Sequence, residues 1–119
     1  MRRLVVIGGS SIWSASLIAA LAALPPLALV LVGRDRARLA ALAELARALL
    51  PAGSAEIAAD PEQALPGADL VLLQVRWGGL EARAQDEEAA RSLGCPADET
   101  LGPAACRMLQ RSTTPLLEL

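Results

Sequence analysis

Short apolar runs alternate along the chain with stretches in which apolar and polar residues mix. The clearest runs cover residues 4–7, 27–32 and 70–75, and a weaker run covers residues 55–58. Continuous runs of Val, Leu and Ile, without alternation, are typical of parallel strands that are buried on both faces. The pattern therefore predicts four strands of a parallel sheet.

Helical spacing of apolar residues follows each of these runs. Leu17, Leu21 and Leu24 recur at this spacing until two prolines stop the helix, and residues 39–49 carry a second apolar stripe. Asp60 and Pro61 form a good helix start, because Asp caps helices and Pro fits their first position. The remaining helices are expected at residues 80–93 and from residue 103 to about residue 111.

The alternation of strands and helices predicts a single doubly wound α/β domain of Rossmann type over residues 1–119. We expect a parallel sheet with strand order 3-2-1-4 and with helices on both faces. In such folds the ligand crevice lies at the carboxyl ends of the strands, where the strand order reverses. Ser10, Gly33 and Arg76 all follow predicted strands, so they should lie at this edge.

The composition argues against several classes of function. The chain has no His, Tyr, Phe or Lys, so two common catalytic side chains are missing. The net charge is −2 and the arginines are scattered, which argues against nucleic-acid binding. Cys95 and Cys106 are too few for a disulfide framework. The N-terminal residues are compatible with a signal peptide but fit a strand, a turn and a helix better, so we expect a cytoplasmic protein with no membrane partner.

The turn after the first strand has the composition of a phosphate-binding loop. Gly8, Gly9, Ser10 and Ser11 stand where the dinucleotide fingerprint G-x-G-x-x-G is found, with Ser10 at its second glycine and Trp13 at its third. Backbone N–H groups at the start of the following helix can bind a pyrophosphate. The alternative is an ordinary glycine-rich turn.

The end of the second strand departs from NAD-binding proteins. An acid usually binds the ribose hydroxyls there, but this chain has Gly33 followed by Arg34. A glycine and an arginine could admit a 2′-phosphate, so NADP is possible, and Asp35 could still bind ribose. The alternative is that residues 34–38 form a solvated start of the next helix.

The segment "ADLVLLQVRWGGLEARAQDE" at residues 68–87 resembles the family 4 glycoside hydrolases, which carry an acidic residue, an apolar strand and then Q-I-R-V-G-G-L-E-A-R-x-x-D-E. Two other segments support the resemblance: "VIGGSSIWSASLI" is similar to the family's phosphate loop, and "DETLGPAACRMLQRSTTP" is similar to Q-E-T-x-G-P-G-G and the helix that follows. The positions that match in the first and third segments are Asp69, Gln74, Arg76, Gly78, Gly79, Leu80, Glu81, Ala82, Arg83, Asp86, Glu87, Glu99, Thr100, Gly102, Pro103, Arg111, Thr113 and Pro115. The chain differs from the family at Ser10, Trp13, Ala15, Gly33, Asp98 and residues 104–105.

The resemblance implies NAD- and metal-dependent 6-phospho-β-glucosidases, 6-phospho-α-glucosidases and α-galactosidases, which are exceptions to the two-carboxylate mechanism. They oxidise the sugar transiently and eliminate the aglycone. Family members are several hundred residues long, and their metal-binding Cys and His and catalytic Tyr lie beyond residue 119. The chain is therefore expected to be the N-terminal NAD-binding domain, with no catalytic residue and no Mn²⁺ ligand of its own, and to be inactive alone.

The resemblance also assigns residues to the site. Cofactor binding is expected at Gly8, Gly9, Ser10, Ser11, Arg34, Gln74 and Arg76. The phosphorylated sugar is expected at Arg83, which suits a bidentate contact with phosphate, and at Glu99. Alternatively, Arg83 pairs with Glu87 one helical turn away, and Glu99 is a charge near a helix N-terminus.

Two other functions remain open: a non-catalytic nucleotide-binding Rossmann fragment, and a domain of a generic nicotinamide dehydrogenase. We also expect apolar residues to be poorly covered, and therefore a homo-oligomer. These residues are Leu80, Leu93, Cys95, Leu101, Leu116 and Leu117. The strands at residues 4–7, 27–32 and 70–75 are expected to be covered on both faces.

Overall fold

The computed structural model of the chain describes residues 1–50 and 54–119. It divides into two compact units, Met1–Val75 and Arg76–Leu119. We call them the sheet unit and the helical unit.

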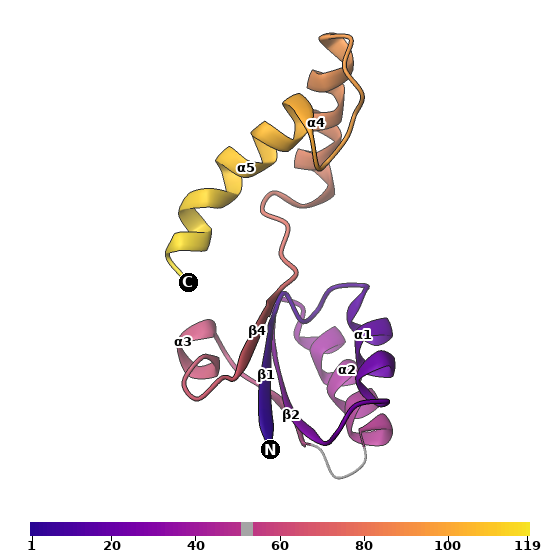
Figure 1. The fold of residues 1–119 in the computed structure, drawn as a ribbon, viewed down its shortest axis with the longest axis vertical. Coiled ribbons are helices and arrows are strands. Elements are labelled where there is room, and N and C mark those ends of the chain that lie inside the picture. Colours follow the sequence, from indigo (N-terminus) through magenta and orange to yellow (C-terminus); the bar gives the residue numbers. More distant parts are fainter. Residues whose placement is uncertain (51–53) are drawn as a thin grey trace. The chain divides into compact units, whose positions relative to one another are not determined.

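The sheet unit is built on four parallel strands (Figure 1). They are β1 (Arg2–Ile7), β2 (Leu27–Val32), β3 (Ser54–Ile57) and β4 (Leu70–Leu73). Their order is β3-β2-β1-β4, and every neighbouring pair is parallel. The predicted strand order is therefore confirmed.

Helices lie on both faces of this sheet, as predicted (Figure 1). Helices α1 (Ser14–Leu21) and α2 (Arg36–Leu49) cover one face, where Leu4 and Val6 of β1 join the larger apolar cluster. Val5 and Ile7 point to the other face, where they pack with Ala64 of the short helix α3 (Pro61–Ala64). Successive side chains of a strand point to opposite faces, so the continuous apolar run of β1 is buried on both sides.

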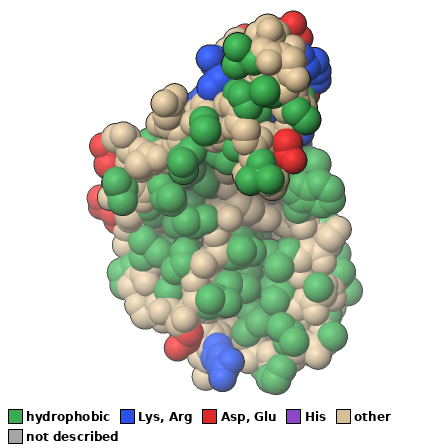
Figure 2. Space-filling model, turned by 45° about the horizontal axis from the view of Figure 1, so that its top comes forward, with side chains coloured by type: hydrophobic (Ala, Val, Ile, Leu, Met, Phe, Trp, Pro, Cys, Tyr) green, Lys and Arg blue, Asp and Glu red, His purple; other side chains and the backbone are tan. Residues whose placement is uncertain are grey.

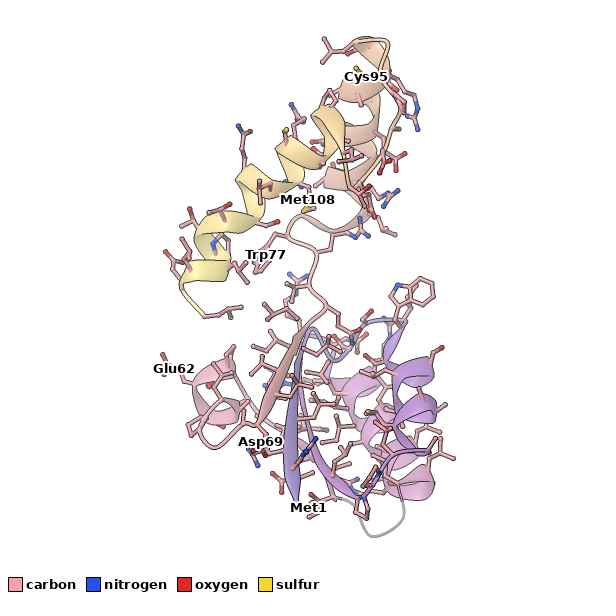
Figure 3. The ribbon with its side chains drawn as sticks, viewed as in Figure 1. Met1, Glu62, Asp69, Trp77, Cys95 and Met108 are labelled. Atoms are coloured by element: carbon pink, nitrogen blue, oxygen red, sulfur yellow. The ribbon has the colours of Figure 1, made fainter. Side chains whose placement is uncertain are left out.

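Local sequence sets the start of α3 and joins β4 to β1. The Asp60 side chain accepts a hydrogen bond from the Gln63 N–H (2.9 Å), and Pro61 is the first helical residue, as predicted. At the amino end of β4, Asp69 accepts a hydrogen bond from the Arg3 N–H (2.7 Å) through Oδ2 (Figure 3). Asp69, which belongs to the motif at the fourth strand, therefore has a structural role here.

Strand β4 is less covered than its sequence suggested. It ends at Leu73 rather than at residue 75, and Leu70, Val71 and Leu73 are 63%, 40% and 43% exposed. The expectation that helices of the chain cover both faces of this strand is wrong. β4 is an edge strand, and α3 is only four residues long, so little of the chain covers this side. Figure 2 shows exposed hydrophobic side chains, in green, across the visible surface.

The helical unit consists of helices α4 (Gly79–Ser92) and α5 (Gly102–Leu117), which pack against each other. α5 continues past residue 111 to Leu117, so that the sequence ends just after this helix, and it contains Pro115. A proline removes one N–H donor and so disturbs one turn. The apolar residues expected to be poorly covered are indeed exposed, apart from the half-buried Cys95.

Candidate functional site

The turn between β1 and α1 is tied to the end of β2. The N–H groups of Gly8 and Gly9 both donate to the Val32 carbonyl, at 2.9 and 2.7 Å. Gly8 has φ +88°, and a Cβ there would collide with the Gln74 carbonyl. Only glycine fits this backbone without strain. The glycines therefore let β1, β2 and the exit of β4 meet closely at the carboxyl edge of the sheet.

Backbone donors of this turn are free to bind an anion. Within residues 1–50 and 54–119, the N–H groups of Ser10 and Ile12 donate to no protein acceptor, whereas the Ser11 N–H donates to the Gly8 carbonyl (2.9 Å). The Ser11 Oγ accepts a weak hydrogen bond from the Trp13 N–H (3.3 Å). Unpaired donors beside a helix N-terminus suit the pyrophosphate of a dinucleotide.

Gln74 connects the exit of β4 to the start of α1. Its Nε2 donates to the Oγ of Ser14 at 2.6 Å, and Ser14 is fully buried. The side chain therefore holds the turn in place beside the predicted binding site. A direct contact between Gln74 and a cofactor stays a prediction.

The segment that follows β2 is partly used by the protein itself. Asp35 caps α2, because its Oδ1 accepts from the Arg38 N–H at 2.9 Å, and its Oδ2 lies 3.7 Å from the Arg38 Nε. Arg36 donates to the carbonyls of Ala58 and Ala59, at 3.4 and 3.2 Å. The alternative of a capped helix start therefore describes Asp35 and Arg36. Arg34 is exposed, and its predicted role is untested.

Arg38 was expected only as part of a solvated helix start, but it contacts the glycine-rich turn. Its Nη1 donates to the Ser10 carbonyl at 3.1 Å, so it joins α2 to the glycine-rich turn. The contact spans 28 positions in the chain. Its sequence signal was the position three residues after the helix cap, one turn into a helix that begins at the ligand edge.

In the helical unit, three of the predicted residues come together. Glu99 forms ion pairs with both Arg76 and Arg83 through its Oε1. Arg83 also donates from Nε to the Oε1 of Glu87 at 2.5 Å, as in the pairing alternative. This hydrogen bond from Arg83 lowers the pKa of Glu87 below its ordinary value.

A second ion cluster stands beside the first. Asp86 is 3% exposed and accepts two hydrogen bonds from Arg111 Nη2, at 2.6 and 2.7 Å, and one from Arg107 Nε at 3.0 Å. The hydrogen bonds from Arg111 outweigh the effect of burial, so the pKa of Asp86 is lowered. Asp86 and Arg111 belong to the segments that resemble the family, but sequence alone did not indicate that they pair.

These side chains surround a pocket of about 20 Å³, which is also lined by Ala104 and Met108. The volume is enough for a water molecule. The lining contains Arg76, Arg83 and Arg111 against three carboxylates, so its charges balance. An incoming phosphate would have to replace a carboxylate as the partner of an arginine.

Two absences concern the described part of the chain. Within residues 1–50 and 54–119, no group of three or more Cys, Asp or Glu side chains is placed to hold a metal ion. None of the helices described there is both long and apolar enough to cross a bilayer.

The sequence profile described as "Family 4 glycosyl hydrolase" matches residues 3–118, almost the whole chain. The chain belongs to glycosyl hydrolase family 4. The resemblance of its three motifs is thereby confirmed. No curated protein matches the chain.

Solved structures of 6-phospho-glucosidases share the fold. A 6-phospho-alpha-glucosidase from gut microorganisms, in complex with NAD and Mn²⁺, is 26% identical with a TM-score of 0.83, over 98% of this chain and 28% of the other. A second structure of a 6-phospho-alpha-glucosidase from gut microorganisms, with NAD and glucose-6-phosphate, is 25% identical with a TM-score of 0.77, over 99% of this chain and 29% of the other. A 6-phospho-beta glucosidase from Thermotoga maritima, with NAD and glucose-6-phosphate, is 24% identical with a TM-score of 0.82, over 98% and 29%. The chain therefore spans less than a third of the length of these enzymes.

Proposed function

We propose that this chain is the dinucleotide-binding domain of a family 4 glycosidase that acts on phosphorylated sugars. The observation that carries the proposal is the turn between β1 and α1, in which the N–H groups of Ser10 and Ile12 have no acceptor among the described residues and lie at the carboxyl edge of a parallel sheet. The family match and the NAD and glucose-6-phosphate named for the solved relatives support it.

The turn would bind the pyrophosphate of a nicotinamide dinucleotide. Two backbone N–H groups would donate to its oxygens, and the turn needs no side-chain movement to present them. A bound nicotinamide supplies reversible hydride transfer, which suits a glycosidase that oxidises its sugar transiently. Arg38, through the Ser10 carbonyl, would keep the turn in its binding conformation.

Arg83 and Arg76 would contribute to the site of the sugar phosphate. Both guanidinium groups now pair with Glu99, so they are held in place before a ligand arrives. A phosphate would take over one of these contacts, since it offers a bidentate guanidinium partner. Glu99 would then be free to accept a hydrogen bond from a sugar hydroxyl. Proton transfer and the divalent metal, Mn²⁺ or similar, would rely on residues outside this sequence, which has no His and no Tyr.

A titration with nicotinamide dinucleotides tests the first half of the proposal. We expect saturable binding of NAD⁺ or NADP⁺ to the chain and its loss in Gly8→Ala, whose Cβ would collide with the Gln74 carbonyl. Gly67→Ala is the matched control, since Gly67 also has a positive φ (+75°) but has open space around it. Absence of binding by both dinucleotides, or unchanged binding by Gly8→Ala, would contradict the proposal.

Titration with glucose 6-phosphate in the presence of saturating dinucleotide tests the second half. Arg83→Ala should weaken binding more than tenfold, as expected for a charge-assisted bidentate contact. Arg91→Ala is the control, because Arg91 lies on the same helix and pairs with Glu87 and Glu88. Dinucleotide binding without any sugar phosphate binding would favour the dehydrogenase or nucleotide-binding alternative. We expect no turnover of 6-phospho-glucosides by the chain alone.

Two further features belong to the same proposal. Charged sugar phosphates do not cross a bilayer unaided, so an enzyme that uses them would work in the cytoplasm, where they are made. Exposed Leu101, Leu109 and Leu117 on or beside α5 favour association with a second copy. Sedimentation would show a homo-oligomer if this is correct and a strict monomer if it is not.

A further inference from the structure

We infer that the dinucleotide site of this chain prefers a 2′-phosphorylated cofactor, of the NADP class, to NAD. The inference rests on the proposed function and concerns the segment after β2, residues 33–38. In Rossmann folds an acid at this place binds the ribose hydroxyls of NAD, whereas an arginine accommodates the 2′-phosphate of NADP. The structure shows why the acid is missing and which arginine is available.

The glycine-rich turn excludes a side chain at position 33. A Cβ on Gly33 would lie 2.6 Å from the Ser10 Oγ, 2.9 Å from the Ser10 N and 3.1 Å from the Ser10 Cβ. One of these neighbours is backbone, so rotation of the serine side chain alone would not make room. Ser10 is further fixed by the hydrogen bond from Arg38 to its carbonyl. With serine at position 10, an acid at position 33 does not fit.

The next acid along the chain already has a partner in the protein. Asp35 caps α2 through Oδ1, and its Oδ2 lies 3.7 Å from the Arg38 Nε. A ribose hydroxyl that approached Asp35 would therefore share the carboxylate with Arg38.

Arg34 is the guanidinium that remains available. Arg36 is engaged by the carbonyls of Ala58 and Ala59, and Arg38 by that of Ser10. In the described part of the chain Arg34 makes no hydrogen bond and no ion pair, and it is exposed directly after Gly33. Residues 33–38 contain three arginines and one aspartate and therefore carry a net positive charge. This charge attracts a dianionic phosphate.

Fluorescence titration measures the preference directly. Trp13 is exposed and belongs to the turn, so Trp77→Phe leaves a single tryptophan reporter beside the site. We expect NADP⁺ to bind at least tenfold more tightly than NAD⁺ at low salt. Equal or tighter binding of NAD⁺ would overturn the inference and leave the proposed function standing. If neither dinucleotide binds, both the inference and the proposed function are wrong.

The variant Arg34→Ala tests whether Arg34 causes the preference for NADP⁺. It should weaken NADP⁺ binding about tenfold or more, as expected for the loss of a charge-assisted contact, and leave NAD⁺ binding unchanged. Arg2→Ala is the control, since Arg2 is exposed at the amino end of β1, the opposite edge of the sheet. An equal effect of Arg34→Ala on both dinucleotides would contradict a contact with the 2′-phosphate.

The double variant Ser10→Gly with Gly33→Asp should reverse the preference. Removing the serine side chain relieves two of the three close approaches to position 33, and the backbone freedom of glycine at position 10 lets its N move away from the third. The new acid can then accept hydrogen bonds from the ribose of NAD⁺. Gly33→Asp alone should disturb the turn and weaken the binding of both dinucleotides. If Gly33→Asp alone binds NAD⁺ as well as the double variant does, the steric argument is wrong.

Discussion

The sheet unit and the helical unit are stabilised in different ways. In the sheet unit the buried residues are almost all apolar, and they form clusters on both faces of the sheet. In the helical unit the buried residues are Asp86, Ala90 and Ala104, and ion pairs connect α4, α5 and the segment before α5. Apolar burial is insensitive to salt and weakly sensitive to pH, whereas exposed ion pairs are sensitive to both.

This difference matters for function. The turn that would bind the dinucleotide belongs to a rigid, apolar framework, so its backbone donors are fixed before the ligand arrives. Arg76 is exposed and Arg83 is half-buried, and both are already paired with carboxylates, so a phosphate would have to displace a carboxylate from them. The two proposed sites therefore differ in whether their ligand-binding groups already have partners in the protein.

The largest expected effect is a cavity in the sheet unit. Leu29→Ala removes a fully buried side chain from the larger apolar cluster, and it should lower the free energy of unfolding by about 2–5 kcal/mol. Leu24→Ala, at a 56% exposed leucine, is the matched control and should cost far less. Hydrogen exchange of the β1 and β2 amides measures the free energy of unfolding of both variants. Equal losses in the two variants would show that burial does not stabilise the sheet.

Asp86→Asn should produce the largest loss in the helical unit. It removes the charge that accepts the hydrogen bonds of Arg107 and Arg111, at an expected cost of about 1–3 kcal/mol. Hydrogen exchange should accelerate in α4 and α5 and stay unchanged in β1 and β2. Glu88→Gln, at an exposed carboxylate that pairs only with Arg91 at 3.5 Å, should change little. Loss of protection in both units would mean that they unfold together.

Low pH should destabilise the helical unit, as Asp86→Asn should. The pKa of Asp86 is lowered in the folded state by Arg111 and Arg107, and that of Glu87 by Arg83. Such groups stabilise the fold fully above their unfolded pKa of about 4, and the stabilisation is lost as the pH falls through the lower, folded value. Circular dichroism and exchange from neutral pH downwards should therefore show loosening of α4 and α5 below about pH 4. Increased helix protection in acid would contradict the sign.

The smallest expected effect concerns the start of α2. Asp35→Ala removes a helix cap and should cost about 1 kcal/mol. Asp35→Asn keeps a capping oxygen and should cost only a few tenths of this value. If Asp35→Ala also abolished dinucleotide binding without changing stability, Asp35 would bind the ribose after all.

Much of the sheet unit could be predicted because its signals are local. The apolar runs of β1 and β2, the prolines after α1 and the cap at Asp60 each act within a few residues, and strand order 3-2-1-4 is the order of the dinucleotide-binding form of the doubly wound fold. The contacts that shape the site are distant in sequence. Arg38 reaches Ser10 across 28 positions, and Asp86 meets Arg111 across 25. Periodicity contains no information on such pairs, and the exposure of β4 depends on what covers an edge strand.

Residue-resolved exchange with and without NADP⁺ tests the central claim most directly. If the turn binds the pyrophosphate, saturating NADP⁺ should slow exchange at the N–H groups of Ser10 and Ile12, which have no protein acceptor among the described residues. The amides within β2 and β3, which already donate within the sheet, should change little at low denaturant. Unchanged exchange at Ser10 and Ile12 under conditions of proven NADP⁺ binding would show that the cofactor binds elsewhere and would contradict the account.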